Sequence, residues 1–279
     1  MAFSERALAS GGVSGVRWCG GAPAIEVILV QYEALLDVYD WLIPDAKLTP
    51  QGSVAALGDL VRTLPADARV LDCSCGTGQL AVGLASLGFD VVATEASAGM
   101  VGRTRELADE HSVPLQAMAA AWDDLPDHFE SSTFDLVICV GNSLCHAQGS
   151  AGRMAALSVM SGLLSPQGLL VLTSRTWELV RAAGTRMDVR DHLVRRRGQD
   201  AVVVYSWQIA QPWDQEHHLE IAVARLGPDG SVLTTSEQLS FWPYRYEVLV
   251  AELRSAGLGI VESTSDPASD VCRVVAALA

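Results

Sequence analysis

Two glycines and two carboxylates lie close together in the first third of the chain, in a spacing suited to nucleotide chemistry. Gly76-Thr77-Gly78, followed by Ala81, fits the pattern G-x-G-x-x-[G/A], which is a weak signal when it stands alone. Here the pattern follows an apolar run and opens a helical one, and Glu95 lies about 20 residues further on. A carboxylate at that place can accept hydrogen bonds from both ribose hydroxyls. The spacing therefore predicts a ligand that contains adenosine.

Asp72 distinguishes between the adenosine ligands, because it lies just before the glycine turn, where a dinucleotide places its pyrophosphate. A carboxylate there would repel two phosphate charges, whereas it would attract the ammonium and sulfonium groups of S-adenosylmethionine (SAM). The sequence therefore favours SAM over NAD and its oxidoreductases. Two other interpretations stay open, in which Asp72 merely caps the turn and the glycines merely serve packing.

Three polar residues further along the chain fall where predicted strands end, and ligands bind at such ends in open α/β sheets. We predict Asn142, His146 and Arg175 as catalytic residues. Arg175 offers a planar fork for a carboxylate, with a surface salt bridge as the alternative. Asn142 would orient an amine. His146 would accept a proton, which matters more for an oxygen nucleophile, or would be purely structural.

The elements that must position these residues alternate between strands and helices from residue 69 to residue 175, and then change to antiparallel patterns. This order predicts an α/β fold: a Rossmann-like, seven-stranded, mostly parallel sheet with helices on both faces, plus an inserted antiparallel sheet. The predicted strands are 70–73, 89–94, 115–119, 134–140, 169–174, 202–209, 218–226, 232–242, 259–263 and 271–277. The predicted helices are 25–43, 51–64, 79–87, 97–107 and 246–256, and Ser165-Pro166-Gln167-Gly168 is a predicted turn.

The composition narrows the class of partner and the compartment. The 279 residues carry a formal net charge of −14, which disfavours nucleic acid and anionic membranes. No apolar run approaches the roughly 18 residues that span a bilayer, and the start lacks the apolar region of a signal peptide. The six scattered cysteines are typical of a reducing compartment, so we expect a cytoplasmic protein. His217 and His218 would point to opposite faces of a strand, and no metal site is predicted.

Two longer motifs resemble a known family. The run VLDCSCGTGQLAVGLASLGFDVVATEAS resembles class I SAM-dependent methyltransferases, and FDLVICVGNSLCH with LLSPQGLLVLTSR is similar to the glycine and sarcosine N-methyltransferase group. The resemblance covers about residues 65–178. It implies that the backbone of Cys75 and Gly76 approaches the methionine part of SAM, that Glu95 and Ser97 face the ribose, and that Met100, Ala121 and Trp122 lie against adenine. The complete predicted cofactor set is Asp72, Cys75, Gly76, Gly78, Glu95, Ser97, Met100, Ala121, Trp122 and Val140.

The resemblance also implies a substrate and a domain plan. Arg175 would hold the carboxylate of an amino-acid-like amine, and an N-terminal lid carrying Tyr32 and Tyr39 would fold over SAM. The predicted substrate-binding residues are Tyr32, Asn142, Arg175, Trp207 and Tyr244. The predicted units are a flexible tail (1–22), lid helices (23–64), the SAM-binding core (65–176), the inserted sheet (177–244) and the last core elements (245–279). A homodimer or homotetramer is expected.

We therefore expect a small-molecule N-methyltransferase. Two alternatives remain: O-methylation of a secondary metabolite with His146 as base, and SAM binding without methyl transfer. The arginine-rich stretch from Arg181 to Arg197 would either bind a larger anionic substrate or form a solvated loop.

Overall fold

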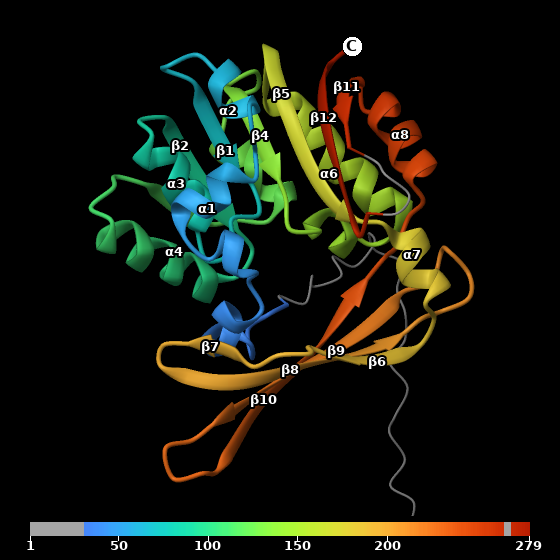
Figure 1. Cartoon of the computed structure of the whole chain (residues 1–279). Coiled ribbons are helices and arrows are strands. Elements are labelled where there is room, and N and C mark those ends of the chain that lie inside the picture. Colours follow the sequence, from blue (N-terminus) through green and yellow to red (C-terminus); the bar gives the residue numbers. More distant parts are fainter. Residues whose placement is uncertain (1–30, 265–268) are drawn as a thin grey trace, which may run out of the picture.

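A seven-stranded sheet forms the centre of the computed structural model, which describes residues 31–264 and 269–279 (Figure 1). In sheet order, the strands are β11 (Leu258–Ser263), β12 (Val271–Leu278), β5 (Leu164–Arg175), β4 (Phe134–Cys139), β1 (Arg69–Asp72), β2 (Asp90–Glu95) and β3 (Gln116–Ala119). The five strands from β5 to β3 are parallel, and β12 is antiparallel to both of its neighbours. The predicted fold class is confirmed.

Alternate residues of the central strands are buried on opposite faces of this sheet. Leu136 and Ile138 of β4 belong to one hydrophobic cluster, and Val137 and Cys139 to the other. The first cluster is covered by α1 (Pro50–Ala55), α2 (Leu60–Thr63), α3 (Gln79–Ser86) and α4 (Ala98–Glu110), and the second by α5 (Leu125–His128), α6 (Gly149–Leu163) and α8 (Tyr246–Ser255). Because both faces are covered, the strands read as continuous apolar runs.

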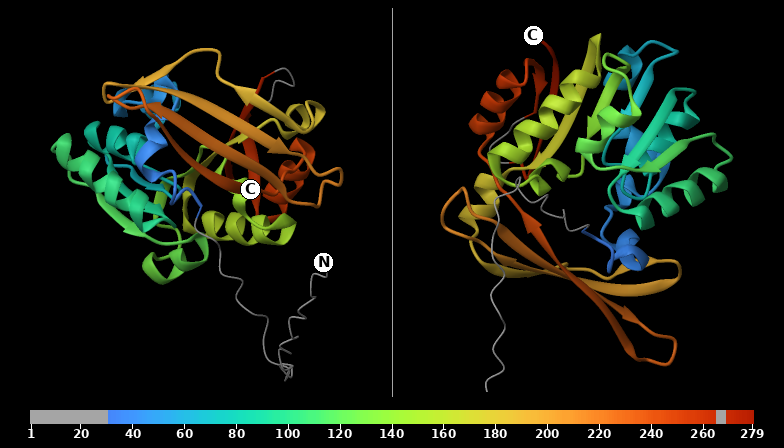
Figure 2. Two further views of the ribbon diagram at one scale, coloured as in Figure 1. Left: turned by 90° about the horizontal axis from the view of Figure 1, so that it is seen from below. Right: turned by 180° about the vertical axis from the view of Figure 1, so that it is seen from behind.

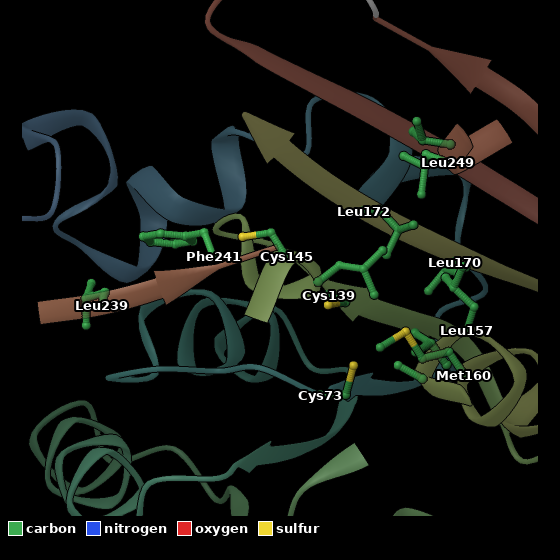
Figure 3. Close-up of a cluster of buried hydrophobic side chains, with 14 of the residues drawn as sticks. Cys73, Cys139, Cys145, Leu157, Met160, Leu170, Leu172, Leu239, Phe241 and Leu249 are labelled. Carbon is green, nitrogen blue, oxygen red and sulfur yellow. The ribbon is translucent and has the colours of Figure 1, made fainter. Parts of the chain in front are cut away.

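A second sheet, antiparallel throughout, lies across the end of the parallel sheet where β5 finishes (Figures 1 and 2). It follows α7 (Trp177–Ala182) and consists of β6 (Arg186–Val189), β7 (Val194–Arg196), β8 (Gln199–Gln208), β9 (His217–Leu226) and β10 (Val232–Phe241). Its last strand joins the two sheets. Phe241 lies beside Cys145 in the buried cluster (Figure 3), and the amide of Trp242 donates to the Cys145 carbonyl at 2.7 Å.

The chain before α1 differs from the two long helices that we predicted. The flexible-tail prediction (1–22) and the start of the helix 25–43 lie outside the described residues. Within 31–43, the structure has one 3-10 helix, η1 (Leu36–Trp41), because Tyr32 adopts a left-handed backbone with φ of 71°. The predicted helix 51–64 is divided into α1 and α2, with Gly58 between them at φ of 62°. A further 3-10 helix, η2 (Asp45–Lys47), precedes α1.

Two further expectations needed correction. The turn predicted at Ser165–Gly168 lies inside β5, where pairing moves from Leu164 directly to Leu169 while β4 advances only from Phe134 to Leu136. A Cβ atom on Gly168 would lie 2.7 Å from the Phe134 carbonyl oxygen, so only glycine permits this approach. The arginine-rich stretch contains β6 and β7 rather than a loop. No described helix is long and apolar enough to cross a membrane.

A buried ion pair joins the two long helices on one face of the sheet. Arg153 of α6 donates to both carboxylate oxygens of Glu252 on α8, each at 2.8 Å, and the two side chains are only 5% and 6% exposed.

Arg153→Met leaves the Glu252 charge buried without its partner. We expect it to lower the free energy of unfolding by about 3–5 kcal/mol in urea denaturation, whereas Arg153→Met with Glu252→Leu recovers most of the loss. The control is Arg62→Met, which removes an exposed pair with Asp59 and should cost at most about 1 kcal/mol. If Arg153→Met lowered the free energy of unfolding by no more than Arg62→Met does, the expectation would be contradicted.

Candidate active site

The chemically important side chains lie along one edge of the parallel sheet. Asp72 ends β1, Glu95 ends β2, Arg175 ends β5, and Asn142 follows β4. Because parallel strands place their carboxyl ends at the same edge, residues far apart in sequence meet there. The inserted sheet and residues 31–48 cover this edge (Figure 2).

Asp72 is a buried carboxylate with few hydrogen bonds to offset the loss of water around its charge. Its side chain is 1% exposed, and within the described part of the chain it accepts one long hydrogen bond, 3.4 Å from the Ser74 amide. Burial raises the pKa of Asp72 to about 7, and the nearby charge of Glu95 adds to the effect, whereas the Ser74 amide opposes it. No described cation pairs with it. A bound ammonium group would supply the missing partner, so this residue fits the predicted SAM site.

Glu95 and the glycine turn form one hydrogen-bonded unit. The amides of Gly76 and Ala96 donate to the Glu95 carboxylate at 3.1 and 2.9 Å, and burial raises its pKa. Gly76 and Gly78 have φ of 55° and 89°, and a Cβ atom on Gly78 would lie 2.7 Å from the Thr104 side chain. The turn therefore packs closely against Thr104, and only glycine fits at position 78. The Glu95 oxygens keep further lone pairs that ribose hydroxyls can use.

The other predicted cofactor residues form the walls beside this turn, and their polar groups already have partners. The Ser97 hydroxyl caps α4 by accepting from the Met100 amide at 3.0 Å and donates to Glu33. The Trp122 indole donates to the Cys73 carbonyl at 2.8 Å. Ala121 donates its amide to the Asp124 carboxylate at 3.0 Å, Val140 accepts at its carbonyl from Ser143 at 2.7 Å, and Met100 and Cys75 are buried. Their contact with adenine stays a prediction.

Asn142 links the ends of β4 and β5. It adopts φ of 72°, and its side-chain oxygen accepts from the Arg175 amide at 2.9 Å and from the Ser174 hydroxyl at 3.3 Å. Its side-chain nitrogen can only donate, and no described residue accepts from it. Asn142 therefore positions Arg175 and offers N–H groups to a ligand.

Arg175 has no acidic partner in the described part of the chain. Its half-buried guanidinium lies 5.5 Å from the ring of Trp207, and no described acceptor bonds to it. By contrast, Arg153, Arg196 and Arg197 each pair with a carboxylate. The surface salt bridge that we considered for Arg175 is therefore not formed with any described residue. An unpaired guanidinium at a ligand edge suits a carboxylate.

His146 and Tyr32 form a short chain of hydrogen bonds at the same edge. The Nδ1 atom of His146 lies 2.9 Å from the Ser240 carbonyl, which can only accept, so Nδ1 carries the proton. Nε2 then accepts from the Tyr32 hydroxyl at 3.2 Å. Burial lowers the pKa of His146 to about 4, so the ring is neutral at neutral pH. Burial also raises the pKa of Tyr32, with Tyr39 and Glu95 adding to the rise and Arg175 opposing it.

The other two predicted substrate residues, Tyr244 and Trp207, are buried next to the end of β5. Tyr244 is 5% exposed and donates to the Ser174 hydroxyl at 2.9 Å, and Trp207 is 3% exposed. The arginine-rich stretch holds the chain before α1: Arg190 donates to the Leu42 carbonyl at 3.1 Å, and Arg196 to the carbonyls of Asp40 and Ile43 at 3.0 Å each. Arg196 is 9% exposed, so the solvated-loop interpretation is wrong for it.

Sequence reasoning missed Glu237, Gln31 and Ser240, which hold Tyr32 and His146 in place. Nothing in the spacing of these residues indicates a common site. No described group of three or more His, Cys, Asp or Glu side chains could hold a metal, and the five described cysteines are free.

Comparison with known proteins supports the assignment of this edge. Residues 70–168 match the family described as a methyltransferase domain. Together with the sheet order, this match identifies residues 70–168 as a methyltransferase domain.

Among curated proteins, the chain is similar to the glycine/sarcosine N-methyltransferase of Aphanothece halophytica, with 32% identity over 42% of this chain and 43% of that protein. It is also 33% identical to the rat (Rattus norvegicus) glycine N-methyltransferase, over 42% and 43% of the two chains. The chain thus matches about two fifths of the length of these relatives.

Two solved structures share the fold over nearly their whole length. A SAM-bound amino pentose methyltransferase from Micromonospora echinaspora superposes with a TM-score of 0.70 at 21% identity, covering 90% of this chain and 98% of that one. A sugar N-methyltransferase from Streptoalloteichus gives a TM-score of 0.64 at 19% identity, covering 98% and 99%.

The raised pKa of Asp72 makes a prediction for cofactor binding. SAM binding needs the ionised carboxylate, while the α-amino group of SAM stays protonated below about pH 7.7. Affinity measured by calorimetry should therefore rise from about pH 5.5 to about pH 7, approaching tenfold per pH unit at the acidic end. Asp72→Asn should bind SAM at least about tenfold more weakly at pH 7 and flatten this dependence.

Asp67→Asn changes an exposed carboxylate near the start of β1 and serves as the control. It should reproduce the pH profile of the unmodified protein. An Asp72→Asn variant with unchanged affinity and slope would contradict the assignment of the ammonium site.

Proposed function

We propose that the protein transfers a methyl group from SAM to the nitrogen of a small amine whose carboxylate is bound by Arg175. The observation that carries the proposal is the half-buried Arg175 guanidinium, which has no described acidic partner and lies at the same edge as Asp72 and Glu95. An amino-acid-like acceptor would bring its own carboxylate to this cation. The N–H groups of Asn142 are donors of the same kind.

A bound SAM would supply an electrophilic methyl group: its S–CH3 bond would break as the neutral amine nitrogen bonds to the carbon, S-adenosylhomocysteine would leave, and the methylated ammonium would lose a proton to solvent. The residues of this chain bind and orient the acceptor, and correct alignment can supply most of the acceleration of such a displacement. The Tyr32 hydroxyl donates to His146, so its oxygen presents lone pairs that can accept an N–H of the amine. Donors at Arg175 and Asn142 and an acceptor at Tyr32 thus suit the two ends of an amino acid.

The names of the relatives also favour nitrogen as the methylated atom. The curated relatives act on glycine and sarcosine, and the structural neighbours include an amino pentose methyltransferase and a sugar N-methyltransferase. All of these names describe small molecules that contain nitrogen. We further propose a cytoplasmic location, which five free described cysteines support.

Arg175 gives the sharpest test of the substrate. In a screen of amines with and without a carboxylate, including amino sugars, we expect turnover only with carboxylate-bearing amines. Arg175→Met should raise the KM for such an acceptor about 100-fold or more by removing two charge-assisted hydrogen bonds, while SAM affinity stays unchanged. Arg186→Met is the control, because Arg186 lies equally close to Trp207 but pairs with Asp188. Turnover of amino sugars that is insensitive to Arg175→Met would instead indicate a sugar acceptor.

His146 tests the O-methylation alternative. Because its Nε2 already accepts from Tyr32 and its pKa is lowered to about 4, a direct role as base is disfavoured. We expect His146→Ala to retain turnover, reduced about tenfold by the loss of a neutral hydrogen bond to Tyr32. Complete loss of turnover with intact SAM binding would favour O-methylation. SAM that persists with every acceptor would favour binding without transfer.

A further inference from the structure

Three backbone amides of the segment that carries Tyr32 donate to a single carboxylate of the inserted sheet. Glu237 of β10 accepts hydrogen bonds from the backbone amides of Tyr32 at 2.6 Å, Ala34 at 2.9 Å and Leu35 at 3.2 Å. One oxygen serves Tyr32, and the other serves Ala34 and Leu35. These amides precede the 3-10 helix η1 and have no helical acceptor of their own, so the carboxylate satisfies donors that would otherwise be unpaired.

Tyr32 needs such a hold because its backbone is strained. A φ of 71° is unusual for a bulky aromatic residue and persists only where the surroundings impose it. Glu237 fixes the backbone of Tyr32, and His146 fixes its hydroxyl. Gln31 adds a reciprocal pair of hydrogen bonds with the backbone of Ser240 on the same strand, at 2.8 and 3.3 Å.

The two ends of the N-terminal segment, residues 31–45, are held independently. Arg190 and Arg196 bond the carbonyls of residues 40–43, and Arg197 pairs with the Asp40 carboxylate at 2.6 Å. Loss of Glu237 therefore removes the acceptor of three backbone amides between residues 32 and 35. The side-chain hydrogen bonds of Gln31, Tyr32 and Glu33 remain, and residues 40–43 stay attached. The affected part is the one that contains Tyr32.

We infer that Glu237 is a positioning residue for methyl transfer, which acts by setting the strained backbone of Tyr32 so that the Tyr32 hydroxyl faces the acceptor. The inference rests on the proposed function, because the Tyr32 hydroxyl orients the amine there. The described hydrogen bonds of the Glu237 carboxylate all come from backbone amides of residues 32–35. Its effect on turnover passes through Tyr32.

The first measurement is the amide hydrogen exchange of residues 31–36 in the full chain with SAM present. Mass spectrometry is the readout. Glu237→Ala should exchange these amides on the order of 10²-fold faster, because three donors lose their acceptor, while the exchange of residues 40–45 stays unchanged. Glu237→Gln keeps one carbonyl oxygen, so the exchange rate of residues 31–36 in this variant should lie between those of the unmodified protein and Glu237→Ala. Glu220→Ala is the matched control, because Glu220 pairs in register with Gln238 on the opposite face of the same sheet.

The second measurement is a double-mutant cycle on turnover. Glu237→Ala should lower kcat on the order of 10²-fold through misplacement of Tyr32, with SAM affinity unchanged and partial rescue by Glu237→Gln. In a Tyr32→Phe background, the same change should have little further effect, because the group on which Glu237 acts is already absent.

The outcomes separate this inference from the proposed function. If the unmodified protein methylates no amine, the proposed function fails, while hydrogen exchange still decides whether Glu237 holds Tyr32. If exchange in Glu237→Ala equals that in Glu220→Ala, the inference is overturned. An equal loss of kcat with and without the Tyr32 hydroxyl would overturn it as well, since Glu237 would then act by another route.

Discussion

The parallel register of β5, β4, β1, β2 and β3 is the constraint on which the site depends. The hydrogen-bond register between neighbouring strands fixes where each strand ends along the sheet. Asp72, Glu95 and Arg175 therefore reach one edge although they are spread over more than a hundred residues. The covered faces of the sheet make these ladders rigid, because close-packed cores deform little. The inserted sheet then closes the edge with residues that the parallel sheet cannot supply.

At the carboxyl edge of the parallel sheet, some polar side chains use their hydrogen-bonding atoms on other residues of the protein, and others keep theirs free for a ligand. Asn142 uses its oxygen on β5, Tyr32 uses its proton on His146, and Trp122 uses its indole on β1. Among the described residues, what remains is the buried carboxylate of Asp72, the guanidinium of Arg175 without an acidic partner, and the phenolic oxygen of Tyr32 with lone pairs that accept no described hydrogen bond. Buried charges are costly unless a partner completes them. The ammonium group of a bound SAM and the carboxylate of an acceptor would supply those partners.

The sequence predicted the parts of this molecule that are determined locally. The apolar strands, the glycine turn and the acidic residues at strand ends follow short rules of spacing, and the fold agrees with them. The N-terminal segment could not be read this way: its periodicity is helical, yet Glu237, from the other end of the chain, holds Tyr32 in a left-handed conformation. The arginines from Arg190 to Arg197 formed a charge pattern that did not predict their partners. Arg190 and Arg196 bond to backbone carbonyls of residues 40–43, and Arg197 pairs with the Asp40 carboxylate. Tertiary contacts of this kind override local propensity.

The sequence separation of 205 between Tyr32 and Glu237 has a consequence for the nascent chain. Synthesis proceeds from the N-terminus, and the last parallel strand, β5, is complete at residue 175. The glycine turn and both carboxylates exist by then, whereas the anchor for Tyr32 emerges more than sixty residues later. A ribosome that stops between these points releases a polypeptide with the residues of the cofactor half and without the means to hold its tyrosine. The parallel strands that carry the predicted cofactor residues are thus synthesised before the residue that anchors Tyr32.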